Sequence, residues 1–316
     1  MMERRFIKSG IPGLDEVLGG GLLEGSIVTV SGPTGGGKST LAAQFLHNGA
    51  AESEEPGLYI SIEESRNDFF FHMSGYSWDF AGLEKTRKFV LLDYPIHEVD
   101  QIVNQSGAIG EIINSTGTKR VVIDSVMPIA LFFKSDDERR KGFLKFIENL
   151  RKWGTTTLIV SEDIKMTGPG AMHGSEYSIE SFTDGWINMG FRYDEEKKER
   201  ARYLEVVKMK GVAHSSRSYP IVLDKDGVRL VTEQKTPAQA PEKPKTAVVK
   251  AAPAEKPKPE AEKPVQKPRT LMAGKAPRTE KTASKPEQES KEKPLKAEDI
   301  AARLDAIKSR LAKKTK

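Results

Sequence analysis

The stretch Ser26–Thr40, SIVTVSGPTGGGKST, decides the fold. Its first half is rich in β-branched apolar residues, which predicts a short buried strand. From Gly32 to Ser39 it matches the phosphate-loop pattern G-x-x-x-x-G-K-[ST] without a mismatch. Apolar residues then recur at helical spacing: Leu41, Ala42, Phe45 and Leu46. Strand, glycine-rich loop and helix in this order form the context in which the pattern binds phosphate groups.

The loop offers what a nucleoside triphosphate requires. Its three consecutive glycines let backbone N–H groups point inward at a helix N-terminus, which makes a nest for phosphate oxygens. We expect Lys38 to neutralise the β- and γ-phosphates of ATP and the Ser39 hydroxyl to ligate Mg²⁺. The residues expected to contact the nucleotide are Gly32, Thr34, Gly35, Gly36, Gly37, Lys38, Ser39 and Thr40. The alternative is a glycine-rich turn that only joins a strand to a helix.

Composition excludes several classes of site. The 316 residues include no cysteine, so disulfides, thiolate chemistry and cysteine-ligated metals are excluded. No stretch approaches the apolar length of a membrane span, and the N-terminal MMERRFIKSG lacks a signal-peptide apolar region. We therefore expect a cytoplasmic protein.

The charge is divided unevenly along the chain. Residues 1–232 carry a net −5, whereas residues 233–316 carry a net +10, 11 of the 18 prolines and no aromatic residue. Such a tail cannot bury enough apolar surface to offset its ordering entropy. The sequence thus predicts a folded domain over 1–232, a disordered linker over 233–295 and a last segment over 296–316.

That last segment has the pattern of an amphipathic helix. Its apolar residues are spaced three and four apart: Ala297, Ile300, Leu304, Ile307 and Leu311. Acids come early and bases late, as the helix dipole favours. A helix this short needs a partner to be stable, which is a second copy of itself, another protein or an anionic surface. The alternative is a frayed helix without a partner.

Further strands and helices alternate after the phosphate loop. Apolar runs predict strands at 58–62, 89–93, 121–125, 157–160, 186–189, 202–209, 219–223 and 228–231, and apolar periodicity predicts helices at 14–18, 98–116 and 136–153. Residues 165–178 are interpreted as a surface loop. We expect an α/β fold, a phosphate-loop domain whose mostly parallel sheet is covered by helices on both faces.

Carboxylates at the ends of two of these strands are candidates for catalysis. Glu63 and Glu64 follow the strand at 58–62, and Asp124 ends the strand at 121–125. One of the paired acids is suited to deprotonate the water that attacks a γ-phosphate. Asp124 has the Walker-B position, in which the carboxylate holds a Mg²⁺-bound water beside Ser39. The alternative for the pair is a solvated strand end followed by Ser65 as a helix cap.

Several motifs together resemble one family. The segment Ser9–Asp15, the run Gly19–Gly21, the phosphate loop, Gln44–Leu46 and Ser61–Ser65 occur in the order and spacing of KaiC-like members of the RecA superfamily. The stretch Val207–Gly211 with His214 resembles the K-x-R-G…H stretch of that family. The resemblance covers about residues 6–231 and is closest to single-domain, archaeal-type members.

The resemblance implies ATP bound between neighbouring subunits of a ring, commonly a hexamer. It implies that Glu63 activates water with help from Glu64, and that Lys208 and Lys210 reach the γ-phosphate of a neighbouring subunit. The family has arginine at position 210, and lysine offers a point charge in place of a planar fork. The alternative for both lysines is a solvated strand edge.

Three functional hypotheses follow. The first is an oligomeric ATPase that converts its nucleotide state into a signal, with the tail as a tether to a partner protein. The second is a recombinase-like accessory protein that binds nucleic acid, which the net charge of residues 1–232 disfavours. The third, a minor one, is autophosphorylation at Ser178, Ser181 or Thr183, where the resemblance is imperfect because Glu180 replaces one of the family's hydroxyl residues.

Overall fold

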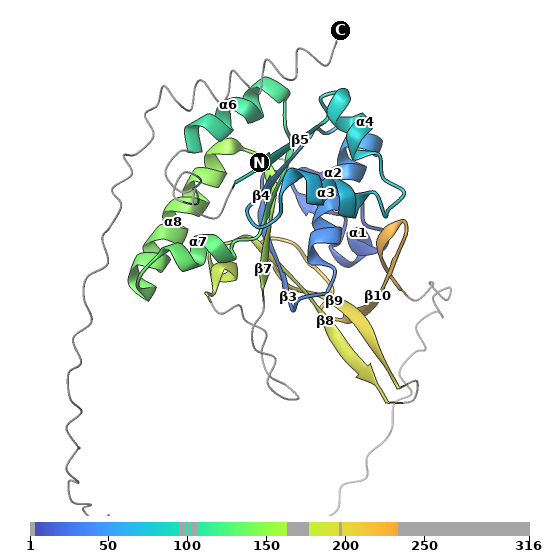
Figure 1. The fold of residues 1–316 in the computed structure, drawn as a ribbon. Coiled ribbons are helices and arrows are strands. Elements are labelled where there is room, and N and C mark those ends of the chain that lie inside the picture. The colour runs from blue at the N-terminus through green and yellow to red at the C-terminus, as the bar shows by residue number, and fades with distance from the viewer. Residues whose placement is uncertain are drawn as a thin grey trace, which may run out of the picture. The chain divides into compact units, whose positions relative to one another are not determined.

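The computed structural model describes residues 4–94, 99, 102, 106–162, 177–195 and 198–232. In chain order its elements are β1 (Phe6–Ile7), α1 (Leu14–Val17), β2 (Leu22–Leu23), β3 (Ile27–Gly32), α2 (Lys38–Glu52), β4 (Gly57–Ser61), α3 (Arg66–Met73), α4 (Phe80–Lys85), β5 (Phe89–Asp93), α6 (Ser106–Thr116), β6 (Arg120–Asp124), α7 (Met127–Phe132), α8 (Asp136–Trp153), β7 (Thr156–Glu162), a 3₁₀ turn (Ile179–Ser181), β8 (Gly185–Asp194), β9 (Glu199–Met209), β10 (Ser218–Asp224) and β11 (Gly227–Leu230) (Figure 1). The fold is of the α/β class that the sequence predicts.

One large sheet organises the described residues. Its strand order is β11-β10-β9-β8-β3-β7-β6-β4-β5. The strands from β8 to β5 run parallel, whereas β9, β10 and β11 are joined to them by antiparallel pairing. The carboxyl ends of β3, β4, β6 and β7 therefore meet at one edge of the sheet, where ligands bind in open parallel sheets.

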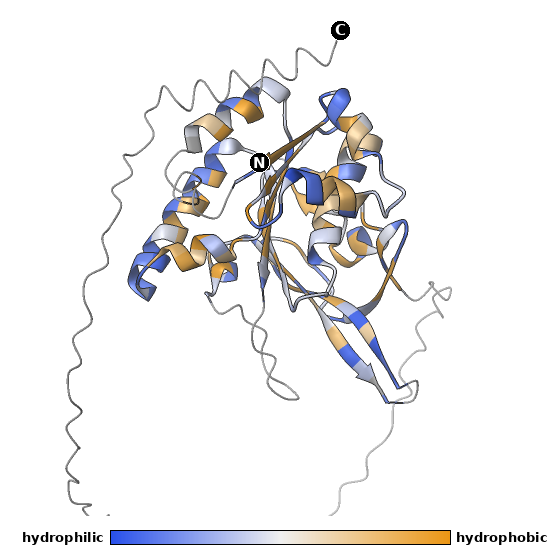
Figure 2. Cartoon of the chain, in the orientation of Figure 1, coloured by the Kyte–Doolittle hydropathy of each residue, from blue (hydrophilic) through white to orange (hydrophobic). Residues whose placement is uncertain are grey.

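Alternate residues of each central strand belong to different cores. Val28 and Val30 of β3 pack in the cluster that includes α1, α2, α3 and α4, while Ile27 packs in the cluster that includes α6, α7 and α8. Figure 2 shows the apolar central strands between the two layers of helices. Period-two burial on both faces explains why these strands read as continuous apolar runs.

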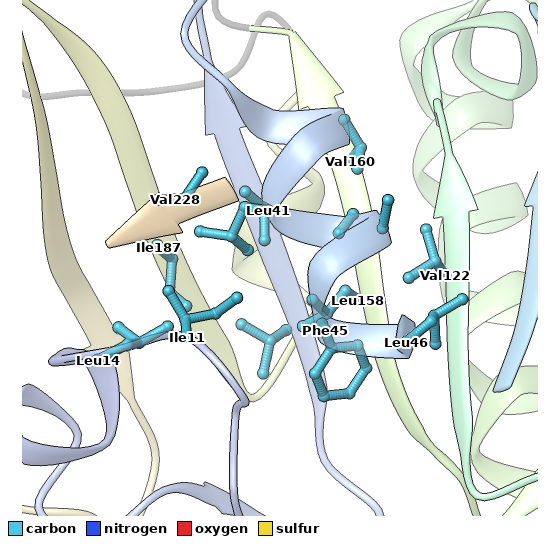
Figure 3. Close-up of a cluster of buried hydrophobic side chains, with 14 of the residues drawn as sticks. Ile11, Leu14, Leu41, Phe45, Leu46, Val122, Leu158, Val160, Ile187 and Val228 are labelled. Atoms are coloured by element: carbon cyan, nitrogen blue, oxygen red, sulfur yellow. The ribbon is translucent and has the colours of Figure 1, made fainter. Parts of the chain in front are cut away.

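Helix α2 is fixed to the sheet by apolar and polar contacts. Figure 3 shows Leu41 and Phe45 of α2 among the buried side chains of the surrounding strands. The amide of buried Gln44 accepts a hydrogen bond from the backbone N–H of Val228 at 2.7 Å and donates one to the Val228 carbonyl at 3.1 Å. Both polar atoms of this glutamine are thus satisfied by β11, which fixes α2 and the loop at its N-terminus.

A buried arginine lies beneath the same helix. Arg120 at the start of β6 donates to Glu55 at 2.6 Å and to the Phe45 carbonyl at 2.9 Å, and its guanidinium stacks on the Phe45 ring. A Cβ atom at Gly49 would collide with this guanidinium. Glycine in the middle of α2 therefore makes room for the arginine despite its low helix propensity.

The structure extends some predicted elements and adds others. The strands expected at 186–189 and 202–209 are the proximal parts of the longer hairpin β8–β9, whose polar distal half has no apolar run to reveal it. Helices α3, α4 and α7 were not predicted, because each has at most eight residues. Strand β6 ends at Asp124, one residue earlier than expected.

Several predicted segments lie outside the described residues. They are most of residues 95–105 in the expected helix 98–116, nearly all of the expected loop 165–178, and the whole tail with its terminal helix. The predicted domain boundaries at 232 and 295 stay predictions. None of the helices in the described part of the chain combines the length and the apolar character needed to cross a bilayer.

Candidate nucleotide-binding site

The phosphate loop runs from the end of β3 to the N-terminus of α2, and two of its glycines are required by the fold. Gly32 has φ +148°, and a Cβ there would collide with the carbonyl oxygen of Met189 in the neighbouring strand β8. Gly37 has φ +99° and is the N-cap of α2, a left-handed conformation that favours glycine. Close strand packing at one end and a left-handed cap at the other thus shape the loop.

A cavity of about 400 Å³ opens over this loop. Its walls come from the carboxyl ends of β3, β6 and β7, from the residues after β4, and from β9 and β10. The lining residues are Thr34, Gly35, Gly37, Lys38, Ser39, Thr40, Glu63, Asp124, Ser125, Val160, Glu162, Arg202 and Leu223. The structure therefore brings together most of the predicted nucleotide-contacting residues with Glu63 and Asp124. Gly32 lies at the base of the loop and does not line the cavity.

The base of the cavity carries the cation and the hydroxyls of the pattern. The Lys38 ammonium donates to the Pro33 carbonyl at 3.1 Å, so it reaches back over the loop. The Thr40 hydroxyl lies 3.0 Å from the Tyr76 hydroxyl, which ties the first turn of α2 to the segment after α3. Lys38 and Ser39 thus face the space in which phosphate oxygens would lie.

Asp124 is a carboxylate held in a largely buried environment. Burial raises its pKa, while hydrogen bonds from Tyr59 and Ser39 and the charge of Lys38 oppose that rise without cancelling it. The Tyr59 hydroxyl donates to Oδ2 of Asp124 at 2.5 Å, and burial together with the carboxylate raises the pKa of this phenol well above its ordinary value. Tyr59 is therefore a permanent proton donor that orients Asp124.

The two adjacent acids after β4 have different partners. Glu63 is exposed and accepts a hydrogen bond at 2.7 Å from the hydroxyl of Ser125, the residue after Asp124. Glu64 forms an ion pair with His72 of α3. Both acids also line a second hollow of about 530 Å³ that shares Ser39 and Asp124 with the first. Of these two acids, Glu63 lines the cavity above the phosphate loop and Glu64 does not.

The predicted cap after these acids is present. The Ser65 hydroxyl accepts from the backbone N–H of Asp68 at the start of α3. The strand-end interpretation and the catalytic one are therefore compatible, since Ser65 caps the helix while Glu63 faces the cavity.

Arg202 is a cavity residue that sequence reasoning missed. Its Nε donates to the Gly35 carbonyl at 3.2 Å from strand β9. No sequence pattern marks it, because it stands in a charged stretch that has several other arginines and lysines. Only the pairing of β9 with β8 brings it to the loop.

Lys208 and Lys210 lie away from the cavity of their own chain. Lys208 pairs with Trp186, near the start of β8, whereas the phosphate loop follows the end of the parallel strand β3. The Lys208 ammonium donates to the carbonyls of Glu180 at 2.9 Å and Thr183 at 2.7 Å, and burial lowers its pKa. The two lysines are thus at the opposite edge of the sheet from the loop.

Lys210 lies 3.5 Å from Asp184, a carboxylate that has stronger partners. Arg151 donates to both oxygens of Asp184 at 2.8 and 3.0 Å, and the backbone N–H of Ile27 donates at 3.1 Å. Burial works to raise the pKa of Asp184, but Arg151 and Ile27 outweigh it and leave the pKa below its usual value. Asp184 therefore stays satisfied without Lys210.

The three hydroxyl residues considered for autophosphorylation differ in exposure. Thr183 is fully buried, and its hydroxyl lies 2.9 Å from the Thr29 hydroxyl inside the sheet layer. Ser178 and Ser181 are exposed. The environment of Thr183 is thus that of a structural hydroxyl.

The residues around Ser39 fit a magnesium ion only in company with phosphate. Among the described residues there is no group of three or more His, Cys, Asp or Glu side chains placed to hold a metal. Mg²⁺ commonly keeps several waters and uses one or two protein ligands plus substrate phosphates. The Ser39 hydroxyl and the Asp124 carboxylate match that requirement.

Comparisons with known proteins agree with this geometry. Fold and loop define a phosphate-loop protein of the RecA-like α/β class. The family model described as "ATPase: KaiC" matches residues 7–235, so the chain belongs to the KaiC-like ATPase family.

Individual relatives have the same character. A UPF0273 protein of Thermotoga maritima is 32% identical over 241 residues, which cover 70% of this chain and 94% of that protein. The circadian clock oscillator protein KaiC of Prochlorococcus marinus is 32% identical over 234 residues, 72% of this chain and 45% of that protein. The match therefore spans less than half the length of that clock protein.

A solved structure supports the same conclusion. The crystal structure of a KaiC-like protein from Pyrococcus horikoshii superposes with a TM-score of 0.64 at 35% sequence identity, and covers 73% of this chain and all of that one. The predicted family resemblance and the predicted fold are confirmed.

Proposed function

We propose that this chain binds Mg·ATP at the phosphate loop and hydrolyses it slowly as part of an oligomer. One observation carries the proposal: Lys38, Ser39, Glu63 and Asp124 line a single cavity above the loop. Family membership supports ATP binding and ATPase activity in general. The roles of single residues and of the metal ion are inferred from the geometry, and the oligomer is inferred from the family resemblance.

Each residue has a distinct task in this proposal. Backbone N–H groups of the loop and the Lys38 ammonium hold the phosphates, and Ser39 and Asp124 hold the metal, Asp124 through a water. A magnesium ion held there would supply positive charge to the phosphate oxygens as negative charge develops on them. Glu63 accepts the proton of the attacking water, because it lines the cavity and its only described partner is the Ser125 hydroxyl. Glu64, paired with His72, assists from the adjoining hollow.

Lys208 and Lys210 act, in this proposal, on the nucleotide of a neighbouring copy. Their position at the opposite edge of the sheet prevents a role in their own cavity. The ring arrangement of the family would bring this edge to a neighbour's phosphate loop. Lys208 would have to exchange the Glu180 and Thr183 carbonyls for phosphate oxygens, whereas Lys210 has only a distant carboxylate to leave.

The tail is proposed to link nucleotide state to a partner protein. The contrast between a net −5 in residues 1–232 and a net +10 in residues 233–316, with an amphipathic pattern at the end, supports a tether and not a further enzyme. Removing residues 233–316 is then expected to leave ATP turnover unchanged. A large loss of turnover in that truncated protein would contradict the proposal for the tail.

Mixing two inactive variants tests the shared site. Lys208→Ala and Glu63→Gln proteins are each expected to have little ATPase activity, since every subunit lacks one essential group. In a mixed oligomer some interfaces pair an intact Glu63 with an intact Lys208, so activity returns on mixing. Activity per mole should also rise with protein concentration and reach a plateau.

The matched control is a substitution on the same strand at a residue that carries no charge and therefore cannot bind phosphate. Val207→Ala protein should remain active alone. Absence of recovery on mixing, together with concentration-independent turnover, would refute the shared site.

The phosphate-loop assignment has its own test, because Lys38→Ala protein is expected to lose Mg·ATP affinity while keeping its fold by circular dichroism.

A further inference from the structure

The distal half of the β8–β9 hairpin has a composition unlike the rest of the sheet. Figure 1 shows the two strands extending beyond the sheet as a two-stranded ribbon. Its described residues alternate aromatic rings with arginines, and Tyr193 has 57% of its surface exposed. Phe191 is half-buried and Tyr203 is buried, so Tyr193 is the exposed ring among the described residues of the ribbon; an exposed ring there adds nothing to the core and suggests a binding role.

Strand pairing sorts these side chains onto two faces. Phe191 pairs with Arg202, and Tyr193 pairs with Arg200. Residues two apart on a strand share a face, so these four form one surface, here called the aromatic-arginine face. Arg192 and Tyr203 lie on the opposite face, where the Arg192 guanidinium stacks on the Tyr203 ring at 4.6 Å.

The aromatic-arginine face carries two positive charges. The guanidinium groups of Arg202 and Arg200 lie 5.4 and 6.0 Å from the centre of the Phe191 ring. None of its four members is acidic, and Glu199 belongs by its alternation to the other face. Both guanidiniums therefore lie beside the Phe191 ring, and Tyr193 lies directly across the strand pair from Arg200.

We propose that this face binds single-stranded nucleic acid. Aromatic rings give bases a stacking platform that tolerates any sequence, and arginines contact the phosphates between them. Cα atoms two residues apart on a strand are separated by about 6.8 Å. That separation is about twice the 3.4 Å rise per nucleotide of a stacked strand, so successive rings fit an extended single strand and not a stacked duplex.

A protein partner fits this face less well. A stable protein interface needs about 800 Å² on each side with an apolar centre. Two rings flanked by two arginines provide little apolar area, but they match the alternating bases and phosphates of a short strand. The net −5 of residues 1–232 implies that binding is modest and sensitive to salt.

The face adjoins the nucleotide cavity. The Arg202 Nε donates to the Gly35 carbonyl, and a Cβ atom added at Gly35 would lie 3.8 Å from the Phe191 ring. A strand bound here would end beside the mouth of the cavity. The proposal does not depend on ATP hydrolysis, because Tyr193 and Arg200 do not line the cavity.

Fluorescence anisotropy of a fluorescein-labelled oligothymidylate, titrated with the full-length chain, tests the proposal. The variants are Tyr193→Ala and Arg200→Ala. The matched control is Arg192→Ala, which removes the same charge from the opposite face of the same hairpin. Phe191 and Arg202 are left unchanged, since Arg202 donates to the phosphate loop and Phe191 lies beside it. Because all proteins retain the basic tail, differences among them report on the hairpin alone.

Wild-type protein should bind, and Tyr193→Ala should weaken binding by about fivefold or more, the loss expected for one stacked base. Arg200→Ala should reduce the slope of log affinity against log salt by about 0.7, as expected for one phosphate contact to a single strand. Arg192→Ala should bind within about twofold of wild type. Unlabelled oligothymidylate should compete better than a duplex of the same length.

Three results would overturn the proposal. Equal affinity in all four proteins would place the binding elsewhere, such as the tail. Equal loss in Arg192→Ala and Arg200→Ala would show a general effect of charge. Failure of wild type to bind, with a change of oligomeric mass in Tyr193→Ala, would show that the face is a contact between copies of the chain.

Discussion

Replacing Tyr59 by phenylalanine tests whether its hydroxyl sustains the charge of Asp124. The hydroxyl donates to the carboxylate at 2.5 Å in a buried setting. Hydrogen bonds to charged groups contribute about 1.5–3 kcal/mol. Because Asp124 also lines a cavity open to solvent, we take the lower end, about 1.5 kcal/mol, as the loss that favours protonation and raises the Asp124 pKa further.

The sign of the effect on stability follows from the direction of the shift. The folded-state pKa of Asp124 is already above its ordinary value, so Asp124 contributes most to stability when protonated, and that contribution is lost as pH rises through the folded pKa. Tyr59→Phe raises that pKa further. The variant should therefore lose about 1.5 kcal/mol more unfolding free energy at pH 7 than at pH 4.

Urea unfolding of both proteins at the two pH values measures this difference. Tyr76→Phe is the matched control, because its hydroxyl bonds to the Thr40 hydroxyl and not to a carboxylate. That control should lose about the same free energy at both pH values. An equal loss at pH 4 and pH 7 in Tyr59→Phe would refute the proposed support of the Asp124 charge.

Three further predictions concern the site and the core. Glu63→Gln should keep ATP affinity but lower turnover about 100-fold or more in a phosphate-release assay, whereas Glu64→Gln should lower it less; the reverse order would exchange their roles. Arg202→Ala should weaken nucleotide affinity by equilibrium titration, and unchanged affinity would limit it to a loop contact. Gly49→Ala should destabilise by about 1–3 kcal/mol by crowding Arg120, although alanine favours helices; a gain in unfolding free energy would contradict that packing.

The central sheet and the phosphate loop could be predicted because each depends on local signals. Ile27 and its neighbours are buried alternately in two cores, so the strand appears in the sequence as an apolar run. The loop pattern by itself indicates phosphate binding. The position of Asp124 followed from the same logic, since a carboxylate after a buried strand must lie at the sheet edge.

The rest depends on contacts between distant segments. Arg202 reaches Gly35 only because β9 pairs with β8. The sequence around residue 202 does not by itself indicate a contact with Gly35. His72 pairs with Glu64 because α3, a helix too short for a clear period, turns back beside the strand end. The polar half of the hairpin lacks the apolar run by which strands are found.

The sheet topology also separates two sets of cations that the sequence presents as one basic stretch. Strand β9 runs antiparallel to β8, so Arg202 near its start lies beside the phosphate loop, and Lys208 near its end lies at the opposite edge. One strand would thus serve two sites, its own cavity at one end and a neighbour's at the other. In the proposed oligomer, nucleotide binding by a neighbouring subunit would change the contacts of β9. The aromatic-arginine face lies on the same hairpin. This arrangement gives a physical route by which assembly, nucleotide state and the hairpin surface can be coupled within one element.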